Sequence, residues 1–155
     1  MLRRLALPLS AALLLASLGA AAFVRLAPSG PEWHVDPETE GRSGPGRWLL
    51  AEGGDAPAPR LAARPERALA AFDAVAREAG AERLVWAPEA GRATYVDRSR
   101  VMGFPDYVSV KVSPEGEGTR LSAYSRLRFG RDDLGVNRAR LERWVAEVEA
   151  ALEAR

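Results

Sequence analysis

The chain has 155 residues, of which 28% are charged and 47% are hydrophobic, and its formal net charge is +1. This length and composition are those of a single globular domain, and two folded domains do not fit. A charge so close to zero excludes a protein that binds nucleic acid through a strongly basic surface. The absence of cysteine excludes disulfides, thiolate metal sites, a cysteine nucleophile and a lipidated cysteine anchor.

Residues 1–26 have the pattern of a membrane anchor or an export signal. Arg3 and Arg4 precede the uncharged stretch Leu5–Val24, and Arg25 follows it. A helix of this length spans roughly 30 Å, the thickness of a bilayer's hydrocarbon core. The small residues that end at Ala22 also suit a signal peptidase, so an uncleaved anchor and a cleaved signal are both open. Because Arg3 and Arg4 keep the N-terminal end in the cytoplasm, we expect an inner-membrane protein with its domain on the periplasmic side, or alternatively a cleaved periplasmic protein.

Residues 27–63, the lead-in segment, are rich in proline and glycine, which disfavours long regular elements and predicts an extended stalk that wraps into the domain. Trp33 and Trp48 are expected to pin this segment to the domain or to the membrane surface. Residues 47–52 are expected to form one short strand.

Residues 64–155 carry the periodicities of a small α+β domain. A helix is expected from Pro65 to Gly80, and a longer one from Leu134 to the C-terminus, with apolar residues at the helical period. Strands are expected at 82–87, 93–101, 107–112 and 121–129, because apolar and polar residues alternate between turn signals. The predicted fold class is α+β: an antiparallel meander of about four to five strands packed against two helices, preceded by an N-terminal transmembrane or signal segment.

Two blocks of polar and glycine-rich sequence stand out, RSRVMGFPD at residues 98–106 and YSRLRFGRDDLGVN at residues 124–137. Together they resemble the domain-of-unknown-function family numbered 1499, over roughly residues 67–152. Members of that family are small bacterial proteins, often with an N-terminal membrane segment. The resemblance implies a similar layout here, and it brings no activity, cofactor or partner with it.

The second block places charged side chains where the last strand meets the last helix. Strand alternation puts Arg126 and Arg128 on one face, and Asp132 or Asp133 is expected to cap the helix. Asn137 falls on the apolar stripe, where a buried amide needs partners. One interpretation is a structural network of Asn137 and Asp133 with Arg126 or Arg128. The alternatives are a surface for a protein partner and an anion site with five candidate ligand-binding residues: Arg100, Arg126, Arg128, Asp133 and Asn137.

The glycines of the two blocks are expected to allow turns of the backbone. Gly103, Phe104, Pro105 and Asp106 predict a turn between strands, with Phe104 in the core and Asp106 bonded to its own backbone. Gly130 and Gly135 are expected to play structural roles around the strand-to-helix connection. A mobile lid formed by the first block with Met102 is the alternative interpretation.

Catalytic chemistry has little support in the sequence. The only histidine, His34, lies in the lead-in segment and is expected to be a plain loop residue, and phosphate-loop, nucleophile-elbow and dinucleotide motifs are absent. No catalytic residue, metal or cofactor is predicted, and no nucleic-acid partner. The leading hypothesis is a non-enzymatic, membrane-tethered periplasmic domain that binds a small anionic ligand or a partner through Arg126 and Arg128. The alternatives are an interaction subunit of an envelope protein complex and a hydrolase built from Arg, Asp and Asn.

Overall fold

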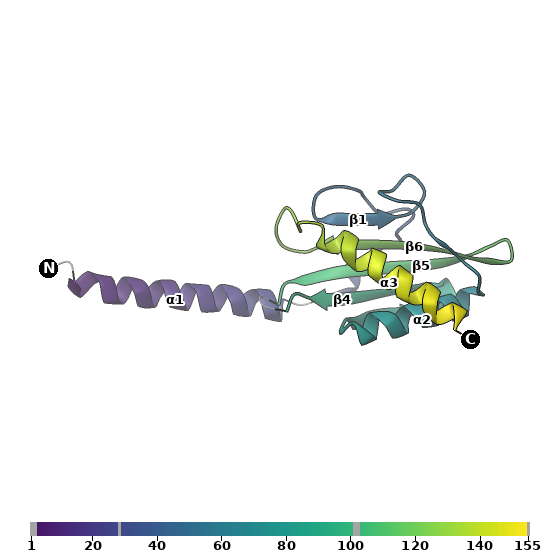
Figure 1. Ribbon diagram of the computed structural model, residues 1–155. Helices are drawn as coiled ribbons and strands as arrows, with labels where there is room; N and C mark the ends of the chain where they lie inside the picture. Colours follow the sequence, from purple (N-terminus) through teal and green to yellow (C-terminus); the bar gives the residue numbers. More distant parts are fainter. Residues whose placement is uncertain (1–2, 28, 101–102, 155) are drawn as a thin grey trace.

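The computed structural model describes residues 3–27, 29–100 and 103–154, with side chains from residue 11 onward. In chain order its main elements are α1 (Arg3–Leu26), β1 (Arg47–Leu50), β2 (Arg60–Leu61), α2 (Pro65–Glu78), β3 (Glu82–Ala87), β4 (Arg92–Arg98), β5 (Pro105–Glu115), β6 (Gly118–Leu127) and α3 (Val136–Glu153). Two short 3-10 turns, η1 (Pro31–Trp33) and η2 (Pro88–Ala90), complete the set. Figure 1 shows α1 extending away from one end of the sheet, while α2 and α3 lie across one sheet face.

The sheet is antiparallel, with the strand order β1-β6-β5-β4-β3, and β2 also pairs with β6. The meander of β3 to β6 follows the predicted strands, and the α+β class is confirmed. The sheet has six strands, which is more than the four to five predicted. The difference is β2, whose two residues are too short to show any alternation in the sequence.

The core lies between the sheet and the two helices. Phe72 of α2, Tyr95 of β4 and Trp144 of α3 are fully buried and meet ring to ring, with centroids between 5.8 and 6.5 Å apart. The stripe predicted on the last helix is confirmed at Leu141 and Val148, which are both 0% exposed. Each large apolar side chain buried in this way contributes about 1.5–3 kcal/mol, so the layer of helices on the sheet is the main source of stability.

The helix ends follow local chemistry. Pro65 opens α2 at its first position, where a missing N–H costs nothing, and Gly80 follows its end with φ of +92°. α3 begins at Val136, two residues later than predicted. The reason is that Leu134 and Gly135 both adopt positive φ, at 52° and 82°, which is incompatible with a right-handed helix.

The second face of the sheet is covered by the lead-in segment, and the prediction that Trp33 pins this segment to the domain is confirmed. Trp33 stacks on Tyr107 of β5, with ring centroids 3.9 Å apart and planes at 7°. Lys111, also on β5, pairs with Asp36 at 2.8 Å and with Glu38 at 2.7 Å. Tyr107 and Ser109 on this face are fully buried, so both faces of the sheet are covered.

From residue 11 onward, where side chains are described, no helix is long and apolar enough to cross a membrane. The predicted anchor or signal of residues 1–26 includes ten residues whose side chains lie outside the described part of the chain.

Candidate functional site

Arg126, the centre of the anion site predicted from the sequence, lies under the lead-in segment. The residue is 6% exposed, and its guanidinium donates to the carbonyl of Trp33 at 2.5 Å and to the hydroxyl of Ser109 at 3.2 Å. It also lies over the ring of Tyr124, 4.7 Å from the centroid. Burial lowers the pKa of Arg126 to about 10, which still leaves it charged at neutral pH. Its charge is therefore used to hold the lead-in on the sheet.

Arg128 lies nearer the edge of the same covered face. Its guanidinium donates to the hydroxyl of Tyr107 at 3.0 Å and lies 5.6 Å from the ring of Trp33. Arg126 and Arg128 share a face, as the strand alternation predicts, but a ligand could reach this face only by displacing Trp33. The two arginines thus belong to the attachment of the lead-in segment.

The buried network predicted around Asn137 forms on the opposite face of the sheet, with a different arginine. Asn137 is fully buried, and its side-chain oxygen accepts from Ser125 of β6 at 2.5 Å and from Arg140 at 2.6 Å. Its amide nitrogen donates to the carbonyl of Gly46. The network therefore joins α3 to β6 and to the start of β1, with Arg140 in the place predicted for Arg126 or Arg128.

Arg140 is the central residue of this network. Its side chain is 6% exposed and donates to Asp97 of β4 at 2.6 Å and to Asp106 of β5 at 2.9 Å. It also donates to the hydroxyl of Ser125 at 3.0 Å. Such a buried cation with two carboxylates fixes α3 over the ends of three strands.

Asp106 is electrostatically unusual. Burial raises the pKa of its carboxyl group, and nearby Asp97 and Asp133 act in the same direction, while Arg140 opposes them. The prediction that Asp106 bonds its own backbone is replaced by this side-chain pairing with Arg140, because Asp106 lies inside β5 and its side chain points toward α3.

Asp133 serves the start of α3. Its carboxylate accepts from the backbone N–H of Gly135 at 3.2 Å and from that of Asn137 at 2.5 Å. Asp132 accepts in the same way from the N–H of Leu134. The prediction that Asp132 or Asp133 is the N-cap is wrong, because Gly135 occupies that position; Asp133 instead accepts from the first turn of α3 from two residues before the cap.

The described residues of the first sequence block lie at the end of β4, at the start of β5 and between these two strands. Gly103 has φ of +70°, and a side chain there would collide with Arg25 at the end of α1. Phe104 is 37% exposed, so its predicted place in the core is wrong; its ring instead lies 6.5 Å from that of Phe129. Pro105 opens β5. Met102, which the lid hypothesis uses, lies outside the described residues.

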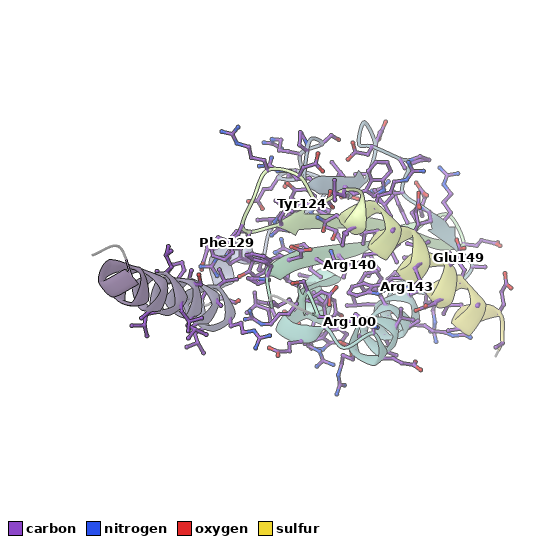
Figure 2. All side chains as sticks on the ribbon, turned by 60° about the vertical axis from the view of Figure 1, so that its left-hand side comes forward. Arg100, Tyr124, Phe129, Arg140, Arg143 and Glu149 are labelled. Atoms are coloured by element: carbon purple, nitrogen blue, oxygen red, sulfur yellow. The ribbon has the colours of Figure 1, made fainter. Side chains whose placement is uncertain are left out.

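A cleft opens above the Arg140 network, between the end of α2, the end of β4 and the first turns of α3. Its volume is about 530 Å³, and its charged lining consists of Asp97, Arg98, Arg100, Asp106, Arg140 and Arg143. We call it the arginine cleft. Figure 2 shows Arg100 on the connection after β4, with Arg140 and Arg143 facing the same side of the domain from α3.

The charge of the arginine cleft is positive. Asp97 and Asp106 share the single charge of Arg140, which leaves one negative charge on the floor. Arg98, Arg100 and Arg143 add three positive charges to the walls, and Arg143 keeps only a loose contact with Glu147 at 3.8 Å. The surplus favours a bound anion that reaches Arg100 and Arg143 together.

Sequence reasoning identified part of this site. Arg100 and Asp106 were singled out, and Asn137 was correctly expected to be buried with partners, whereas Asp97, Arg140 and Arg143 were not noticed. Arg140 lies three residues after Asn137, on the same side of the helix, and this spacing is the signal that could have found it.

His34 is more than a loop residue. Its Nδ1 makes a 2.8 Å hydrogen bond with the hydroxyl of Thr94, which in turn bonds Ser109 at 3.1 Å. Burial, together with the charge of Arg92, lowers the pKa of His34. In the part of the chain that the structure describes, no three His, Asp or Glu side chains are grouped to hold a metal ion.

A family model described as "Protein of unknown function (DUF1499)" matches residues 51–148. The chain belongs to this family. The match confirms the resemblance seen in the two sequence blocks. The matched range includes every charged residue of the arginine cleft and begins after Trp33 and β1, so the cleft lies within the part shared with the family. No curated protein matches the chain.

Proposed function

We propose that this chain is a membrane-tethered domain that binds a small anionic ligand, such as a carboxylate or a phosphate, in the arginine cleft. The observation that carries the proposal is the pair of exposed arginines, Arg100 and Arg143, above a floor fixed by buried Arg140. The buried floor is already ordered before an anion binds, so the cost of ordering the protein is confined to the two exposed arginines, about 0.5–1.5 kcal/mol for each side chain.

The tether is supported by the sequence alone. Twenty uncharged residues, Leu5–Val24, lie between Arg3–Arg4 and Arg25, and this pattern directs the following domain out of the cytoplasm. An inner-membrane location with the domain on the periplasmic side follows from it, with cleavage near Ala22 as the alternative. Expression of the full chain in a bacterial host, followed by alkaline extraction of the membranes and protease treatment of spheroplasts, tests both.

The two other hypotheses have less support. A hydrolase would need a carboxylate set apart from arginines, but Asp97 and Asp106 both pair with Arg140. An envelope interaction subunit would be favoured by an apolar outer face on α3. The described part of that face instead carries ion pairs, Arg138 with Glu142 and Arg143 with Glu147.

Ligand binding can be tested with the full chain in detergent, using inorganic phosphate and citrate as probes in titration calorimetry. We expect at least one probe to bind, and we expect the double variant Arg100→Ala, Arg143→Ala to weaken binding about tenfold or more. Arg138→Ala is the matched control, because Arg138 is also an exposed arginine of α3 but lies outside the cleft. Binding that falls equally in the control would indicate a general effect of charge and refute the site.

A further inference from the structure

The end of the sheet nearest α1 carries exposed apolar side chains on two adjacent connections. These are Phe104, between β4 and β5, and Leu134, between β6 and α3. Figure 1 shows both connections at the end where α1 meets the domain, while the turn between β5 and β6 lies at the far end. Ring contacts link the parts, since Phe129 lies 6.2 Å from Phe23 of α1 and 6.5 Å from Phe104.

Leu134 is the most exposed of these side chains. It is 94% exposed, and among the described residues it is the only one other than glycine with positive φ. A leucine in this conformation is costly, and here it gains nothing from burial within the chain. Asp132 accepts from the Leu134 N–H and so holds the loop in this shape. The loop therefore presents an apolar tip to something outside the domain.

The same end is rich in arginine. Arg131 is exposed beside Leu134, and Arg25 is exposed at the end of α1. Arg98 and Arg128 are half-buried nearby, and the carboxylates of Asp132 and Asp133 are bonded to backbone N–H groups of the loop. The exposed charge of Arg131 thus lies on the same connection as the apolar tip, which complements an anionic surface.

We infer that this end of the domain docks on the headgroup layer of an anionic bilayer, with Leu134 and Phe104 inserted among the lipids and Arg131 on their charged groups. The inference rests on the proposed tether, because α1 would bring this end, and no other, to the membrane. Apolar tips beside arginines are the combination that binds a bilayer surface, because the apolar side chains enter the lipid and the arginines are attracted to its anionic groups. Docking would place the arginine cleft, whose lining includes Arg98 and Arg100 at this end of the sheet, beside the headgroup layer.

The chain has no cysteine, so a single cysteine can be introduced for a fluorescent probe. The full chain with Leu134→Cys, labelled with an environment-sensitive dye, is reconstituted into vesicles of phosphatidylcholine with phosphatidylglycerol that contain a lipid-attached quencher. Glu117→Cys, in the turn at the far end of the sheet, carries the same dye as the matched control. We expect quenching at position 134 and none at 117. Arg131→Ala should lower the docked-to-undocked ratio about fivefold.

The outcomes separate docking from the tether. If the chain resists alkaline extraction from the vesicles but the dye at position 134 is unquenched, the tether is right and docking is wrong. If alkali releases the chain, the tether is wrong and docking, which rests on it, is overturned as well. Equal quenching on vesicles of phosphatidylcholine alone would overturn the role of anionic lipid.

Discussion

Replacing Arg140 by alanine is expected to destabilise the domain more than any other single change in the arginine cleft. The guanidinium donates to Asp97 at 2.6 Å, to Asp106 at 2.9 Å, to Ser125 at 3.0 Å and to Asn137 at 2.6 Å, and its side chain is 6% exposed. Removing it leaves two adjacent carboxylates partly buried without their cation. The expected loss is about 3–5 kcal/mol, because unpaired buried charges are far more costly than a lost surface pair.

A loss of this size is a large share of the roughly 5–15 kcal/mol by which a domain is stable. Urea unfolding of the full chain in detergent, followed by near-UV circular dichroism, measures it. Arg143→Ala is the matched control, since Arg143 lies one turn further along α3 and only contacts exposed Glu147, and it should change stability by less than about 0.5 kcal/mol.

The pH dependence of the same variant gives a second readout. Without Arg140, the folded-state pKa of Asp106, already raised by burial, rises further, and so the folded chain binds more protons than the unfolded one in the acidic range. The difference in the free energy of unfolding between the wild type and Arg140→Ala should therefore become smaller as the pH is lowered. A cost below about 1 kcal/mol, or a deficit that does not change with pH, would refute the account of a cation shared by two buried carboxylates.

Other changes test the rest of the fold. Arg126→Met and Trp33→Ala should each cost about 2–3 kcal/mol and make the lead-in segment more sensitive to protease, because both hold that segment on the sheet; unchanged cleavage would contradict this. Asn137→Ala should cost about 1–3 kcal/mol in urea unfolding, against less than about 1 kcal/mol for Arg138→Ala, which loses an exposed ion pair and a contact over the ring of Trp48. Because the pKa of His34 is lowered, the unfolded chain binds more protons near its ordinary value of 6.5, so wild-type stability should fall as the pH drops below 6.5, and His34→Gln should flatten that slope.

The sequence by itself determined the helices and strands and the face of the sheet that packs against the helices. The alternation along β5 and β6 and the stripe of Leu141, Trp144 and Val148 are local patterns, and the structure has them where the periods of two and 3.6 residues place them. The family followed from two contiguous blocks of sequence, and so did the bond from the Asn137 N–H to the carboxylate of Asp133 at the start of α3. Each of these features depends on residues close together in the chain.

Only the tertiary structure decided which partners the buried polar groups have. Arg126 and Arg140 look alike in the sequence, yet one bonds the carbonyl of Trp33, 93 residues away, and the other bonds Asp97, 43 residues away. Leu134 likewise looks like an ordinary helix residue until its positive φ and its exposure are known. A proline- and glycine-rich segment has no hydrophobic periodicity, so its sequence does not indicate which face of the sheet it will cover. A charged side chain pairs with the polar group that the fold brings within about 3 Å of it, and that group can be far away in the sequence.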